Sequence, residues 1–253
     1  MKLGCCAALD EYPLVAKAGF DYIELKGIEI SAWSEKQLAG AVRRMEKGPI
    51  RCEAVNGYCN AGTPLVGPHF DPAAVQRYAR LLARRARQMG ATRIGVGAPK
   101  ARCIPPGFDR ALAERQFIMA MRLAAEETAR EGLRLLLEPL SEPCCNFLCN
   151  TGEAEDAVKR VGRPLFGLMV DFWHAHQMKE PLDGLAAYLR QAGYIHYSGP
   201  GRAARSYPLP GEEPVLRGWC RALLRSGYCG DISLEIGHPH QGAAAAGVGG
   251  DDG

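Results

Sequence analysis

Residues 133–171 read LRLLLEPLSEPCCNFLCNTGEAEDAVKRVGRPLFGLMVD. The stretch begins and ends with an apolar run, 133–138 and 166–171, and each run finishes on an acidic residue. Between the runs, Thr151 followed by acidic residues is a typical helix start. Short apolar runs separated by a helix are typical of parallel β/α units, whose sheet is buried on both faces. The stretch therefore predicts strand, helix and strand, with a carboxylate at the end of each strand.

The same alternation recurs along the whole chain. Eight short apolar runs occur, and each of the first seven precedes a plausible helix; the runs are 2–5, 22–25, 52–56, 93–97, 133–138, 166–171, 194–198 and 232–236. Two of the intervening stretches, 72–89 and 109–131, place their apolar side chains on one helical face. Eight such units in about 240 residues match the usual size of a closed (β/α)₈ barrel.

An open, doubly wound α/β sheet is the alternative fold. Such a sheet usually carries a glycine-rich phosphate loop after its first strand, and neither GxGxxG nor GxxxxGK[ST] occurs at Gly4 or after Gly95. We therefore predict a single-domain (β/α)₈ barrel over residues 1–241. The Gly/Ala-rich segment 242–253 is expected to be a disordered tail that replaces the last helix. One side of the barrel would then be uncovered, which predicts a homo-oligomer, a dimer or a tetramer.

Composition and charge exclude several classes of protein. The chain has 31 basic and 28 acidic residues, a formal net charge of +3 and no block of like charges, so binding to nucleic acid or to a membrane surface is not expected. No apolar run reaches about 18 residues and the start lacks a signal peptide, which predicts a cytoplasmic protein. The ten cysteines are scattered and several lie inside apolar runs, so we expect reduced thiols without zinc-finger spacing.

Four of the apolar runs end in a polar residue that could bind a metal ion: Glu138, Asp171, His196 and Glu235. Active sites of (β/α)₈ barrels lie at the carboxyl ends of the strands. Each residue alone could be an ion-paired or helix-capping side chain, but burying three carboxylates together without a cation is costly. Three carboxylates and one imidazole suit hard divalent ions. We predict one bound divalent metal ion, with Mn²⁺ favoured and Mg²⁺ or Co²⁺ as alternatives.

Several motifs carry a family resemblance when they are taken in order. They are Leu-Glu138-Pro-Leu, then Asn146-Phe-Leu-Cys-Asn-Thr151, Asp171-Phe-Trp-His174, His196 with Arg202 six positions on, and Ser-Leu-Glu235, with Pro105-Pro-Gly-Phe-Asp-Arg110 as a weaker one. Their order and spacing resemble the sugar isomerases and epimerases of the xylose isomerase-like barrel superfamily. The ketose 3-epimerase and hydroxypyruvate isomerase-like branch is the most similar.

This resemblance implies a proton transfer through an enediolate on a ketose or related hydroxyketone, assisted by the metal ion. It assigns the acid/base pair to Glu138 and Glu235, on opposite faces of the substrate. It also implies that His174 and Arg202 bind a small-molecule sugar or sugar phosphate, with Arg205 close enough to replace Arg202. Glu24 matches a family position near the sugar, although a role as partner of an Arg or Lys is equally open.

One loop departs from the family pattern. Segment 141–145 reads Ser-Glu-Pro-Cys-Cys, which places Cys144 where a substrate-contacting carboxylate would be expected, so the sugar stays open. Two other functions also stay open: an inosose-type dehydratase that uses the same metal site, and a non-catalytic sugar-binding barrel. The motifs favour the isomerase or epimerase.

Overall fold

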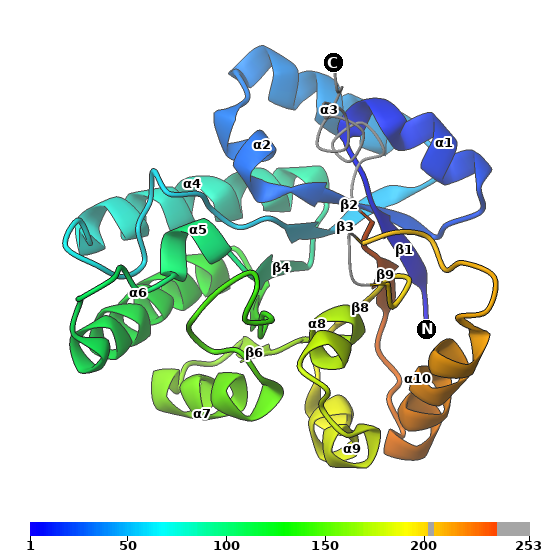
Figure 1. The fold of residues 1–253 in the computed structure, drawn as a ribbon. Helices are drawn as coiled ribbons and strands as arrows, with labels where there is room; N and C mark the ends of the chain where they lie inside the picture. Colours follow the sequence, from blue (N-terminus) through cyan, green and yellow to red (C-terminus); the bar gives the residue numbers. More distant parts are fainter. Residues whose placement is uncertain (202–204, 237–253) are drawn as a thin grey trace, which may run out of the picture.

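The predicted apolar runs form parallel strands that close into a barrel (Figure 1). The computed structural model describes residues 1–201 and 205–236. Its strands are β1 Leu3–Cys6, β2 Tyr22–Lys26, β3 Arg51–Asn56, β4 Arg93–Val96, β5 Arg134–Leu137, β6 Phe166–Leu168, β7 Val170–Asp171, β8 Ile195–Tyr197 and β9 Ile232–Leu234. The sheet order is β6-β5-β4-β3-β2-β1-β9-β8-β7, and every pair is parallel.

The run 166–171 closes the ring. It is interrupted at Met169, so that it counts as two short strands, β6 and β7. The first pairs with β5 and the second with β8, and the backbone N–H of Met169 donates to the carbonyl of Leu137. The eight predicted strands therefore correspond to one closed barrel, and the predicted (β/α)₈ fold is confirmed.

Helices surround the strands, as Figure 1 shows. They are α1 Tyr12–Lys17, α2 Gly27–Ala32, α3 Glu35–Lys47, α4 Pro72–Met89, α5 Pro99–Arg102, α6 Arg110–Arg130, α7 Thr151–Val161, α8 Phe172–Gln177, α9 Leu182–Gln191 and α10 Glu213–Ser226, with a 3-10 turn at Leu9–Glu11. Helix α7 begins at the predicted place, but the capping side chain is Asn150, which accepts from the backbone N–H of Glu153. Thr151 is the first helical residue.

The barrel interior is filled by side chains. Tyr22 and Tyr194 belong to a buried cluster with Ala54, Leu136 and Met169. The guanidinium of Arg93 lies over both tyrosine rings, 5.2 and 4.3 Å from their centroids, and pairs with Asp231 at 3.0 Å. The interior is thus a packed core, which leaves the strand ends as the place for a site.

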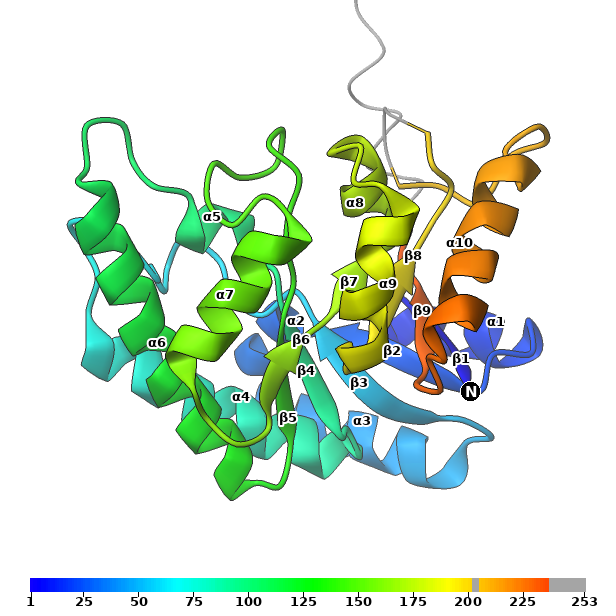
Figure 2. The ribbon, with the colours of Figure 1, turned by 90° about the horizontal axis from the view of Figure 1, so that it is seen from below.

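Figure 2 shows which end of the barrel carries the connections that follow the strands. Helices α5 and α8, which begin within a few residues of the ends of β4 and β7, lie at one end, and the amino terminus lies at the other. The predicted tail 242–253 and any helix after β9 fall outside the described residues. All ten cysteines are free thiols. Within 1–201 and 205–236, no helix is both long and apolar enough to cross a bilayer.

Candidate active site at the carboxyl ends of the strands

The four predicted strand-end side chains converge on one point. Glu138 and Glu235 directly follow β5 and β9, Asp171 ends β7, and His196 is the middle residue of the short strand β8. Each of the four offers a ligand atom within 4.8 Å of the others. Nδ1 of His196 lies 2.9 Å from Oε2 of Glu235 and 4.0 Å from the nearest oxygens of Glu138 and Asp171. The side chains of Glu138, Asp171 and His196 are buried, and that of Glu235 is 24% exposed.

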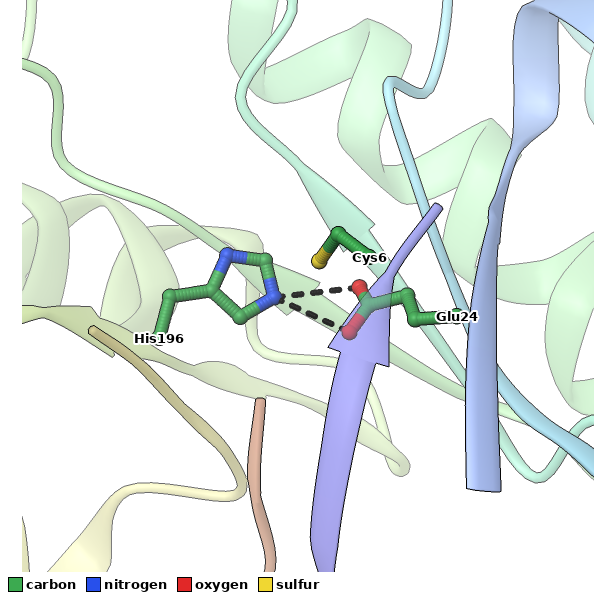
Figure 3. Close-up of side chains that lie close together, drawn as sticks. All are labelled: Cys6, Glu24 and His196. Atoms are coloured by element: carbon green, nitrogen blue, oxygen red, sulfur yellow. Dashed lines mark hydrogen bonds and ion pairs between the residues drawn. The ribbon is translucent and has the colours of Figure 1, made fainter. Parts of the chain in front are cut away.

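The buried carboxylate of Glu24 binds His196 on the side of the ring that faces away from the other carboxylates. Nε2 of His196 donates to both carboxylate oxygens of Glu24, at 3.0 and 3.2 Å (Figure 3). The Tyr194 hydroxyl donates to Oε2 of Glu24 at 2.5 Å, and the carboxylate has no exposed surface. A metal-binding histidine commonly donates its second ring N–H to a carboxylate in this way. Nδ1 is therefore the ring nitrogen that faces the other carboxylates.

The thiol of Cys6 lies beside this hydrogen bond, as Figure 3 shows. Cys6, Glu24 and His196 are close enough to form a second group of possible metal ligands. However, burial raises the pKa of the Cys6 thiol well above its usual range, and only the thiolate is a good ligand. The hydrogen bond between His196 and Glu24 explains why these side chains lie together, without a metal ion. The role of the cluster is therefore to hold the ring of His196 in place.

The donor atoms fit a hard divalent cation. Oδ1 of Asp171 accepts the backbone N–H groups of Trp173 and His174, at 2.7 and 3.2 Å, and so begins α8. Its Oδ2 is buried and lies 2.9 Å from Nη1 of Arg205, but outside hydrogen-bond geometry. A buried carboxylate oxygen without a hydrogen bond, beside two more carboxylates and an imidazole, is a set that Mn²⁺ or Mg²⁺ would bind.

The two neighbouring carboxyl groups differ in acidity. Burial raises the pKa of Glu138, and the charge of Asp171 adds to this effect against the opposing charge of Arg205. For Asp171, burial alone would raise the pKa, but the positive charges of Arg205, His174 and His196 lower it to about 2. Neighbouring carboxyls with separated pKa values are typical of acid/base sites. Glu138 is therefore the better proton acceptor of the two.

His174 lies in the site, and Arg205 lies beside it. Nε2 of His174 is 2.6 Å from Nη2 of Arg205 and 3.9 Å from Oε1 of Glu138. The same guanidinium pairs with Asp171, with Glu235 and, at 3.5 Å, with Glu138. Arg202, the first choice from the sequence, lies outside the described residues. Arg205, the alternative, is the described arginine of this loop that contacts the carboxylates.

Two further side chains contact the site and were not predicted. Arg102 has no exposed surface; its guanidinium donates to the backbone carbonyls of Glu138 at 2.8 Å and Leu148 at 3.3 Å. Asn56 donates from Nδ2 to Oε1 of Glu235 at 3.4 Å, and its buried Oδ1 has no partner among the described residues. Asn56 ends the third apolar run, so the strand-end rule could have found it. No sequence signal marks Arg102.

Comparison with known proteins matches the chain to a family. A family model described as the xylose isomerase-like TIM barrel matches residues 13–249. A human protein that is provisionally named a hydroxypyruvate isomerase is 31% identical over 161 residues, 60% of this chain and 56% of the relative. A 2-oxo-tetronate isomerase of Pectobacterium atrosepticum is 29% identical over 114 residues, 42% and 44% of the two chains. The chain thus spans about half the length of these relatives.

A solved structure gives the same result for the fold. The D-allulose 3-epimerase of Methylomonas sp. in complex with D-allulose superposes with a TM-score of 0.79 at 18% identity. The superposition covers 94% of this chain and 85% of that one. At this identity, the likeness establishes the barrel architecture over nearly the whole chain.

Proposed function

The chain belongs to the xylose isomerase-like TIM barrel family, and we propose that it is a divalent-metal-dependent isomerase or epimerase of a ketose or related hydroxyketone. The observation that carries the proposal is the convergence of three carboxylates and Nδ1 of His196 at the strand ends. The names of the curated relatives, isomerases of hydroxypyruvate and of 2-oxo-tetronate, support the substrate class.

The proposed metal ligands are Glu138, Asp171, His196 and Glu235. A divalent cation bound there supplies positive charge to the substrate carbonyl and hydroxyl oxygens, which acidifies the neighbouring C–H. Glu138 and Glu235 act as the acid/base pair: one removes the proton to give an enediolate, and one returns a proton to the same or the adjacent carbon. The raised pKa of Glu138 supports its role as proton acceptor.

The remaining polar side chains bind substrate or position the ligands. His174 and Arg205 face the carboxylates and would contact substrate oxygens, a role for which Arg202 remains a candidate. Glu24 is engaged by His196 and Tyr194, which supports a positioning role for it rather than contact with the sugar. Mn²⁺ is the proposed ion, with Mg²⁺ or Co²⁺ as alternatives, since the donor set is dominated by oxygen.

The proposal extends to assembly and location. An apolar groove of about 350 Å³ lies between α10 and the strands β1, β8 and β9, and its lining includes Leu3, Trp219 and Leu223. Its apolar lining supports a homo-oligomer, a dimer or a tetramer. A cytoplasmic location is proposed from the sequence.

The test is isotope exchange. The protein is incubated with Mn²⁺ in D₂O with hydroxypyruvate, D-fructose, D-tagatose or D-allulose, and deuterium on substrate carbon is followed by NMR. We expect exchange with at least one of them, loss of exchange in Glu235→Gln, and retention in Glu35→Gln, an exposed carboxylate on α3. A product lighter by one water would show a dehydratase. Metal binding without exchange by any of the four would contradict the acid/base assignment.

A further inference from the structure

The imidazole of His174 is oriented by the backbone of the loop that follows β5. Its Nδ1 accepts the backbone N–H of Ser141 at 2.9 Å, and the Ser141 hydroxyl lies 3.0 Å from the same nitrogen. Both residues are buried. A backbone N–H can only donate, so this contact places the ring lone pair at Nδ1 and the ring proton on Nε2. The Arg205 guanidinium, which also can only donate, lies 2.6 Å from Nε2 and favours the opposite tautomer. The amide of Ser141 is fixed in a buried turn, whereas Arg205 extends from a loop and is 17% exposed, so the amide contact is the one that the fold maintains.

We propose that Ser141 is a positioning residue that fixes His174 as the tautomer protonated on Nε2, so that His174 presents a hydrogen-bond donor to a substrate oxygen. The tautomer rests on the contact with the Ser141 amide; its use on a substrate rests on the proposed function. In this tautomer, neither ring nitrogen of His174 is free to accept a proton from substrate. Proton transfer is then left to the carboxylates, Glu138 and Glu235.

Nε2 of His174 lies only 2.6 Å from Nη2 of Arg205. A guanidinium has no acceptor, so with the ring proton on Nε2 the two groups cannot bond to each other, and the Arg205 side chain must turn away from the ring. Two donors directed at one region are best satisfied by an oxygen that accepts from both. A carbonyl oxygen that gains negative charge during enolisation is such an acceptor, and fixed donors stabilise developing charge. Of the substrate oxygens, the keto oxygen would gain most from these two donors, because its negative charge increases during enolisation.

The loop after β5 holds Ser141, and helix α8 holds His174, each through its own contacts. Ser141 begins a turn in which its carbonyl accepts the backbone N–H groups of Cys144 at 2.8 Å and Cys145 at 3.1 Å. On the other side, the backbone N–H of His174 is capped by Asp171, and the Trp173 ring packs edge-on at 5.0 Å. The segment 141–145, which departs from the family pattern, thus supplies the amide that sets the tautomer.

The first test reads the tautomer directly, in the metal-free protein and without substrate. The six histidines are labelled with ¹⁵N, and two-bond ¹H–¹⁵N correlation spectra are recorded. The ring signals of His174 are those missing from His174→Gln. We expect an unprotonated Nδ1 and a protonated Nε2. A proton on Nδ1, or averaging between the two tautomers, would overturn the proposal whatever the protein catalyses.

Two substitutions of Ser141 distinguish the effect of its backbone N–H from that of its hydroxyl. Ser141→Ala keeps the backbone N–H, so the tautomer should persist; Ser141→Pro removes the N–H, so the signals of His174 should become averaged. Loss of the tautomer in Ser141→Ala would show that the hydroxyl sets it and would refute the role of the amide. If the proline variant does not fold, the spectra of the wild type and of Ser141→Ala still show whether the tautomer is present and whether it needs the hydroxyl.

The functional consequence is tested by two replacements of the imidazole. The side-chain amide of Gln reaches about as far as Nε2, whereas that of Asn reaches only to the position of Nδ1. In the D₂O exchange assay with Mn²⁺, His174→Asn should lower kcat/KM by about 100-fold, as loss of a fixed donor to developing charge does, and His174→Gln by clearly less. Equal losses in the two variants would refute the donor role. Absence of exchange in the wild type would contradict the proposed function but not the tautomer.

Discussion

Replacing Glu24 by Gln measures how strongly a carboxylate behind His196 sets the affinity of the site for a divalent cation. Gln retains an oxygen that can accept from Nε2 of His196 and an amide that can donate to the Tyr194 hydroxyl, so the shape is kept and the charge is lost. Glu24 is fully buried, so water does not screen that charge. Removing such a partner of a metal-bound histidine typically weakens binding about 10- to 100-fold, or about 1.4 to 2.7 kcal/mol.

The assay is calorimetric titration of the metal-free protein with Mn²⁺. Urea unfolding of the metal-free variant comes first, so that any loss of fold is separated from loss of affinity. Glu35→Gln is the matched control, because it makes the same chemical change on a side chain that is 84% exposed. A folded Glu24→Gln protein that binds Mn²⁺ within about twofold of the wild type would refute the reasoning, since the outer-shell effect would then be absent.

Three further substitutions have distinct expected outcomes. Arg205→Ala should tighten Mn²⁺ binding in the same titration, because the guanidinium competes for Asp171 and would no longer do so. Arg102→Met should lower the free energy of unfolding in urea by about 2 kcal/mol or more, since two buried carbonyls lose their donor. Glu127→Gln should cost about 2 kcal/mol at pH 7, because hydrogen bonding by Arg80 lowers the pKa of Glu127 to about 2. A group with a depressed pKa stabilises above its unfolded value, so this difference should be complete above about pH 5 and vanish as the pH falls towards 2.

The barrel and the four strand-end side chains could be predicted because both follow from local rules. An apolar run that ends in Glu138 or Asp171 needs only a parallel sheet to bring its end to the edge where the other runs end. Helix α4 has the predicted bounds, 72–89, because Asp71 caps it and Gly90 ends it in a left-handed conformation. These signals lie within a few residues of the element that they define.

Contacts across the barrel could not be predicted in the same way. Glu24 is visible as the polar residue near the end of β2, but its partner His196 lies 172 positions further along the chain. Which residues of two strands face each other inside a barrel depends on strand register and tilt, which no local pattern encodes. The contacts of Arg102 are even harder to predict, because it binds backbone carbonyls. Every residue has a backbone carbonyl, so the sequence does not show which of them Arg102 binds.

The buried charges indicate two roles for Arg205: it pairs with the carboxylates when no metal ion is bound, and it could bind substrate when one is. Three carboxylates converge there, and Arg102, without exposed surface and bonded to two carbonyls, is a permanent positive charge beside them. Arg205 is 17% exposed and lies on a loop, so its guanidinium can move at lower cost. A divalent cation together with Arg102 would balance the three carboxylates. Arg205 would then be released from them and, next to Nε2 of His174, would be placed to bind an oxygen of the substrate.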